Sequence, residues 1–116
     1  MSVRLNTSSA GSLTTGSFSA NTDLSTGANT DPTGISIGDL DGDGKPDIVT
    51  GNYLSNTVSV FRNTSTPGNL TFDTRFDFAT GTTPMIVEIV DIDGDGKPDI
   101  AAQCWNSNAF SVLRNT

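Results

Sequence analysis

Two short segments of the chain concentrate aspartate and glycine at regular spacing. They read DLDGDGKPD at 39–47 and DIDGDGKPD at 91–99. Four carboxylates within nine residues repel one another, and a hard divalent cation among them removes that repulsion. Calcium accepts oxygen ligands from closely spaced aspartates and backbone carbonyls. We therefore predict two Ca²⁺ ions per chain, one per loop, with these ligands, the lysines through their carbonyls: Asp39, Asp41, Asp43, Lys45 and Asp47, and Asp91, Asp93, Asp95, Lys97 and Asp99.

Other interpretations of the two acidic loops are weaker. An EF-hand requires a glutamate at the twelfth loop position, where this chain has Thr50 and Ala102. Magnesium prefers few protein ligands and keeps its waters. A solvated acidic turn remains the alternative without metal, but two identical copies in register argue against it. Because one loop supplies all the ligands, a structural ion is favoured over one that bridges to a ligand.

Composition excludes several classes of function. Six basic residues stand against thirteen acidic ones, so a net charge of −7 leaves no basic patch for nucleic acid. The chain has no histidine, which removes the commonest general base and the partner of most nucleophiles. No apolar run is long enough to insert into a membrane, and the first residues lack the apolar region of a signal peptide. The single cysteine, Cys104, is expected to be a small buried side chain.

The chain repeats itself with a unit of about 54 residues. Residues 34–64 align with 86–116, residues 17–27 with 71–81, and residues 2–13 with 59–70. Each unit holds four strand-like runs: A before the acidic loop, B after it, then C and D, both with alternating apolar residues. In chain order the runs are C (2–7), D (17–25), A, B, C (57–63), D (70–79), A, B and C (109–115). Turn residues separate the runs and no helical period occurs, so the predicted fold class is all-β.

The acidic loop, the KPDI that completes it and an alternating strand ending in Arg-Asn-Thr resemble the FG-GAP/VCBS repeat, found in integrin α-type β-propellers. The resemblance implies four-stranded antiparallel propeller blades, calcium in the loop between the first two strands, and an extracellular or cell-surface parent protein. Residues 28–80 would form the first blade and 81–116 a second blade without its outer strand. Residues 2–27 would be C and D strands that complete a neighbouring blade. We therefore expect a cyclic homo-oligomer, a trimer or a tetramer.

The expected function is that of a calcium-binding, non-catalytic propeller module with a structural or assembly role. The alternative is a carbohydrate-binding, lectin-like module, in which Tyr53 and Trp105 would stack on a glycan. The same aromatics otherwise pack between blades. A polysaccharide hydrolase or lyase is disfavoured because nothing pairs the remaining acids for acid–base work: Asp73, Asp77 and Glu88. Arg62 and Arg114 recur at the end of run C and are predicted to form ion pairs between repeats.

Overall fold

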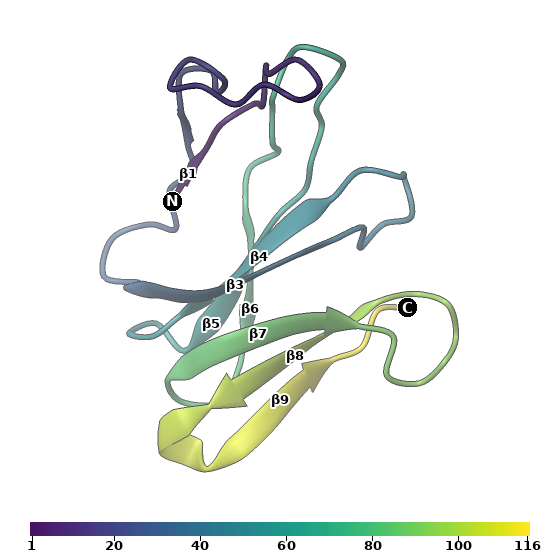
Figure 1. Ribbon diagram of the computed structural model, residues 1–116. Coiled ribbons are helices and arrows are strands. Elements are labelled where there is room, and N and C mark those ends of the chain that lie inside the picture. The colour runs from purple at the N-terminus through teal and green to yellow at the C-terminus, as the bar shows by residue number, and fades with distance from the viewer.

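The computed structural model describes residues 1–116 and contains three antiparallel sheets and one short 3₁₀ turn. The predicted all-β class is therefore confirmed. The N-terminal pair lies at one end of the molecule and a three-stranded sheet at the other, with a four-stranded sheet between them (Figure 1). The elements are β1 (Ser2–Val3), β2 (Thr22–Asp23), β3 (Pro32–Gly38), β4 (Asp47–Asn52), β5 (Thr57–Phe61), β6 (Phe76–Ala79), β7 (Pro84–Val90), β8 (Asp99–Cys104), η1 (Trp105–Ser107) and β9 (Ala109–Leu113).

The two larger sheets follow the predicted runs. Strands β3-β4-β5-β6 pair in sequence order, and so do β7-β8-β9. The central strands β4 and β8 carry the most buried residues, because each has a neighbour on both sides and lies between layers. The outer edge of β9 has no strand partner, whereas β6 covers the corresponding edge of β5.

The N-terminal runs form less sheet than their alternation predicts. Runs 2–7 and 17–25 give only the two-residue strands β1 and β2 and one isolated bridge between Asn6 and Phe18. No inner strands lie beside this pair, so little holds it in a continuous ladder. Run D at 70–79 likewise forms strand only over β6, preceded by a bridge between Asn63 and Phe72. The 3₁₀ turn η1 was not predicted; it is followed by Asn108, whose φ of 49° suits asparagine.

Two hydrophobic clusters hold the sheets together. The first lies between the four-stranded and three-stranded sheets and includes Val49, Val58, Val87, Ile100 and Ala102. The second joins the N-terminal pair to the opposite face of the four-stranded sheet. It consists of Leu24, Ile48 and Phe61, with Met1, Val3 and Phe72 packed against them. The N-terminal pair therefore occupies the position of a preceding layer.

Strands β3 and β7 approach unusually closely, and glycine permits it. A Cβ atom on Gly34 would lie 2.5 Å from the carbonyl oxygen of Met85, and one on Gly51 of the neighbouring strand β4 would lie 2.9 Å from that of Pro84. A Cβ atom on Gly38 would lie 3.0 Å from Ile89. The corresponding residues of the second repeat are Ile86, Gln103 and Val90. The outward face of the second sheet therefore has side chains where the first sheet has none.

Candidate metal centre

Each acidic loop connects two antiparallel strands of one sheet. The first spans 39–46 between β3 and β4, and the second spans 91–98 between β7 and β8. Glycine allows the backbone to turn within the loop: φ is 76° at Gly42 and 83° at Gly44, and 77° and 87° at Gly94 and Gly96. L-residues rarely adopt these angles, so the DGDG sequence fixes the shape of both loops.

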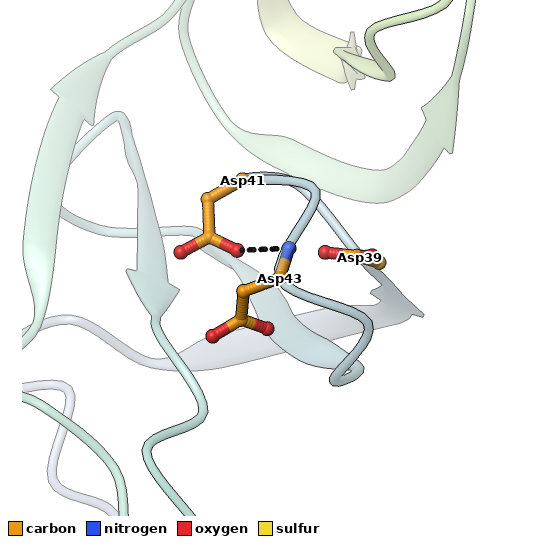
Figure 2. Close-up of side chains that lie close together, drawn as sticks. All are labelled: Asp39, Asp41 and Asp43. Carbon is orange, nitrogen blue, oxygen red and sulfur yellow. Dashed lines mark hydrogen bonds between the residues drawn. The ribbon is translucent and has the colours of Figure 1, made fainter.

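In the first loop the carboxylates accept hydrogen bonds from the loop's own backbone. Asp39 accepts the N–H groups of Gly42 and Gly44, both at 2.9 Å. Asp41 accepts the N–H of Asp43 at 3.1 Å (Figure 2). Asp43 in turn accepts the N–H of Lys45 at 2.9 Å. Each carboxylate oxygen has two lone pairs, so these bonds orient the side chains and leave acceptor capacity for a cation.

The second loop repeats the arrangement. Asp91 accepts the N–H groups of Gly94 and Gly96 at 2.8 and 2.9 Å. Asp93 accepts the N–H of Asp95 at 3.2 Å, and Asp95 accepts that of Lys97 at 2.9 Å. The two loops differ at the lysine side chain, because Lys45 pairs with Asp43 at 2.9 Å and Lys97 makes no corresponding ion pair. Because the backbone hydrogen bonds are the same in both loops, the backbone geometry follows from the sequence of the loop and not from its place in the chain.

The structure brings three carboxylates together in each loop. One oxygen each from Asp39, Asp41 and Asp43 lie within 4.8 Å of one another. In the second loop the group consists of Asp91, Asp93 and Asp99. Two calcium ligands on opposite sides of an ion, each at about 2.4 Å, are about 4.8 Å apart. The donors are hard oxygens at a spacing that one such ion can span. Of the other predicted carboxylate ligands, Asp47 and Asp95 lie outside these two groups. The backbone carbonyls of Lys45 and Lys97 do not belong to such side-chain groups and stay predicted ligands.

Asp47 and Asp99 are buried at the base of the loops. Asp47 is 1% exposed and accepts the N–H groups of Leu40 at 2.9 Å and Asn63 at 2.8 Å. Asp99 accepts those of Ile92 at 3.1 Å and Asn115 at 2.8 Å. Each carboxylate thus joins its loop to the end of the third strand of the same sheet. A buried carboxylate is tolerated because its charge is hydrogen-bonded.

The predicted pairing of Arg62 and Arg114 between repeats is wrong, because both arginines pair within their own repeat. Arg62 binds Asp41 and, at 3.2 Å, Asp43; Arg114 binds Asp93 and, at 3.1 Å, Asp95. The third strand of each sheet ends beside the loop between its first two strands, which places the arginine there. An arginine recurs at the same sequence separation after each acidic loop, and this recurrence was the sequence signal for the contact.

The ion pairs and hydrogen bonds of the loops shift the pKa values of the charged side chains that form them. The hydrogen bond from Arg114 lowers the pKa of Asp93 below its usual value. For Asp43 the pKa is lowered first by the Lys45 side chain and then by its backbone N–H. The pKa of each arginine is raised by its aspartate partner. The lowered pKa keeps Asp43 and Asp93 anionic at neutral pH, as cation binding requires.

The aromatic residues weighed for sugar binding differ in exposure. Tyr53 is half-buried, and Trp105 is 63% exposed on η1. Packing between the two sheets therefore does not account for Trp105. Cys104 is buried, as predicted. No helix of the structure has the length and apolar character needed to cross a membrane.

The fold and the two loops define a β-protein built from tandem repeats, each with an aspartate-glycine loop between its first two strands. A family model described as FG-GAP-like repeat matches residues 7–50 and 39–102. The chain belongs to this FG-GAP-like repeat family. No curated protein matches the chain. No solved structure matches it either.

Proposed function

We propose that the protein is a calcium-binding β-propeller module with a structural role, taking one Ca²⁺ in each acidic loop. The observation that carries the proposal is the duplicated loop geometry, with three carboxylate oxygens gathered within 4.8 Å in each repeat. The family match supports it, because the matched ranges 7–50 and 39–102 include both acidic loops. Mg²⁺ prefers few protein ligands and keeps its waters, so a loop that offers several carboxylates suits Ca²⁺ better.

The first loop would hold its ion with Asp39, Asp41 and Asp43, and the second with Asp91, Asp93 and Asp99. Calcium supplies positive charge that offsets the repulsion between the carboxylates. Asp47 and Asp99 connect each loop to the third strand of its sheet, so order in the loop also stabilises the strand end. Bound calcium would thus stabilise each sheet at the end where the loop lies.

Calorimetry tests the metal sites directly. We expect two calcium equivalents for the native chain, one for Asp41→Ala or Asp93→Ala, and none for the double variant. Binding to the folded state stabilises it by about 2.7 kcal/mol per site at a hundredfold excess over Kd, so the melting temperature should rise with calcium. Asp31→Asn is the matched control, since Asp31 lies outside both loops. Absence of binding heat and of a melting shift at millimolar calcium would refute the proposal.

The module is proposed to be non-catalytic. In support, Asp77 accepts a hydrogen bond from Ser59 at 2.6 Å and pairs with Arg75 at 3.0 Å, so its carboxylate is already engaged. Asp73 lies 3.7 Å from Arg62. Turnover of a polysaccharide that is lost in Asp77→Asn or Glu88→Gln would contradict this proposal.

A carbohydrate-binding role is the second candidate, and one observation favours it. Trp105 and Phe110 are exposed and border a shallow hollow of 190 Å³ together with polar side chains of Gln103 and Asn108. An exposed aromatic ring beside amide groups suits stacking on a sugar ring. A glycan array with native protein and Trp105→Ala tests it. Retained binding in the variant, or no binding by the native chain, would exclude this site.

The extracellular or cell-surface setting and assembly into a cyclic homo-oligomer, a trimer or a tetramer, are proposals of the same kind. Two apolar faces support assembly. Ile35 and Ile37 are exposed on one side of the four-stranded sheet. Ile86, Phe110 and Val112 are exposed on the three-stranded sheet. Contact between these different faces would be head-to-tail, which closes into a ring when the rotation permits.

A further inference from the structure

We propose that residues 18–25 of a second copy of this chain bind the open edge of β9 as the outer strand of the three-stranded sheet. The inference rests on the proposed assembly role and specifies its contact and register. In this arrangement Asp23 of one copy lies opposite Ser111 of the other, and Phe18 lies opposite Asn115.

The register follows from two pairs of strands already present in the chain. In the four-stranded sheet Ser59 lies opposite Asp77, and Asn63 bridges to Phe72. In the N-terminal pair the repeat-equivalent residues make the same contacts: Ser2 lies opposite Asp23, and Asn6 bridges to Phe18. Both pairs also share a serine-to-aspartate hydrogen bond. Residues 18–25 are therefore already shaped as the outer strand of a sheet.

The sequence of β9 matches that of β5, the strand that pairs with an outer strand in the four-stranded sheet. Ser111 and Asn115 are the repeat equivalents of Ser59 and Asn63. The Ser59 hydroxyl donates to an outer-strand carboxylate, whereas the Ser111 hydroxyl has none beside it and accepts the N–H of Gly81. An exposed strand edge pairs readily with another chain. Asp23 would supply the missing carboxylate.

A groove between the two larger sheets would accommodate the aromatic ring of Phe18 from the second copy. The groove has a volume of 380 Å³, and its apolar lining includes Val60, Phe76, Phe78, Ile100 and Leu113. Its counterpart on the other side of the four-stranded sheet is the cluster of Leu24, Ile48 and Phe61, against which Phe72 packs.

Phe72 therefore contributes to the second cluster a ring that the open groove lacks. Phe18 is the repeat equivalent of Phe72 and is 46% exposed. Bound at β9 in the same register, it would occupy in the groove the position that Phe72 has in the cluster.

The exchange also covers the outward face of β9. Phe110 and Val112 are 74% and 55% exposed, whereas their repeat equivalents Val58 and Val60 are fully buried and half-buried. Residues 18–25 already pack on Ile48 and Phe61 of their own chain through Leu24. The incoming β9 would replace β1 beside them, so Phe110 and Val112 take the places of Met1 and Val3. The displaced strand is only two residues long.

The inner strands of the two copies remain farther apart than β3 and β7 within one chain. Ile86 and Val90 stand where Gly34 and Gly38 allow the close approach. Contact between copies is therefore made mainly through the outer strand and the groove.

Disulfide trapping tests the register. In a Cys104→Ala background, Asp23→Cys with Ser111→Cys should form intermolecular disulfides in most of the protein under mild oxidation. Ser25→Cys with Ser111→Cys is the matched control, one same-face position out of register, and should cross-link at least tenfold less. Equal cross-linking of both pairs, or none in the first, would overturn the proposal.

Light scattering on the 116-residue chain provides the independent measurement. We expect concentration-dependent oligomers, and Phe18→Ala should weaken the association by about 30-fold, as for a central aromatic anchor. Leu13→Ala is the control, because Leu13 is exposed outside the contact. A monomer at all concentrations would overturn strand exchange, while calorimetry on the same sample reports the metal sites separately. Two calcium equivalents on a monomer would leave the metal proposal standing.

Discussion

The side-chain amide of Asn115 donates a hydrogen bond to the backbone carbonyl of Leu40, 75 residues earlier in the chain, at 2.7 Å. The same amide reaches the carbonyl of Pro98 at 3.1 Å. Leu40 lies in the first acidic loop, and Pro98 lies in the second. One asparagine thus connects the two candidate metal centres, and the conformation of each loop depends on the end of the second sheet.

Replacing this asparagine should destabilise the contact between the two sheets. In Asn115→Ala both carbonyls lose a partner in a half-buried site, and we expect a loss of about 1–2 kcal/mol in the free energy of unfolding. The comparison variant is Asn63→Ala, whose side chain donates to the carbonyl of Pro46 and accepts the N–H of Ser65, both within its own repeat. Urea unfolding measures both. An unchanged free energy of unfolding in Asn115→Ala would contradict the bridging role.

The close approach of β3 and β7 predicts a severe effect of one methyl group. In Gly34→Ala the added carbon would lie 2.5 Å from the backbone carbonyl oxygen of Met85, so the strands must separate. Overpacking of this kind costs about 1–3 kcal/mol. Gly16→Ala is the matched control, because its nearest neighbour would be 3.8 Å away. Similar melting temperatures for the two variants would show that the strands yield easily.

The buried carboxylate at the base of the first loop should contribute more to the free energy of unfolding than the exposed carboxylates do. Asp47→Asn keeps one acceptor oxygen but presents an amide NH₂ to a backbone N–H that was paired. We expect a loss of about 1–3 kcal/mol in calcium-free buffer. Asp41→Asn removes an exposed ion pair and should cost less than about 1 kcal/mol. Urea unfolding with a chelator present measures the free energy of unfolding of both variants. A larger loss in Asp41→Asn than in Asp47→Asn would contradict the role assigned to Asp47.

The pairing of β1 with β2 should depend on pH in a defined direction. The hydroxyl of Ser2, and then the amide of Asn21, lowers the pKa of Asp23 below its ordinary value. A carboxylate with a lowered pKa in the folded state stabilises that state above the unfolded pKa, and this stabilisation is lost as the pH falls through the folded pKa. NMR titration of the dilute chain measures it. Ser2→Ala should raise the pKa of Asp23, and an unchanged value would show that Ser2 is not its partner.

The order of runs around the acidic loops was sufficient to predict most of the fold. Strands β3, β4, β7 and β8 lie where runs A and B flank the two loops, and β5 and β9 lie within the alternating C runs. The aspartate-glycine spacing was likewise sufficient to place the two loops. Local sequence could not predict which predicted ligands converge. Asp47 and Asp99 have the same loop position, yet only Asp99 joins the acidic group of its loop.

The errors arose where tertiary contacts decide the structure. The role of Arg62 depends on where the third strand ends relative to a loop of the same sheet, which spacing along the chain does not give. The brevity of β1 and β2 reflects the lack of inner strands beside them, although their alternation matches that of β5 and β6. Exposure of Trp105 depends on which faces are covered and has no signature in its own segment.

The glycines that let β3 meet β7 make the two repeats unequal as building units. The first repeat carries Gly34 and Gly38 on one side of its inner strand and Ile35 and Ile37 on the other, so a copy of it could follow itself with the same close fit. The second repeat carries Ile86 and Val90 on the side that a successor would meet. Gene duplication of the first unit would therefore lengthen the array, whereas duplication of the second would introduce a steric break that needs compensating substitutions. The order of the repeats along the polypeptide is thus constrained by residues that take no part in metal binding.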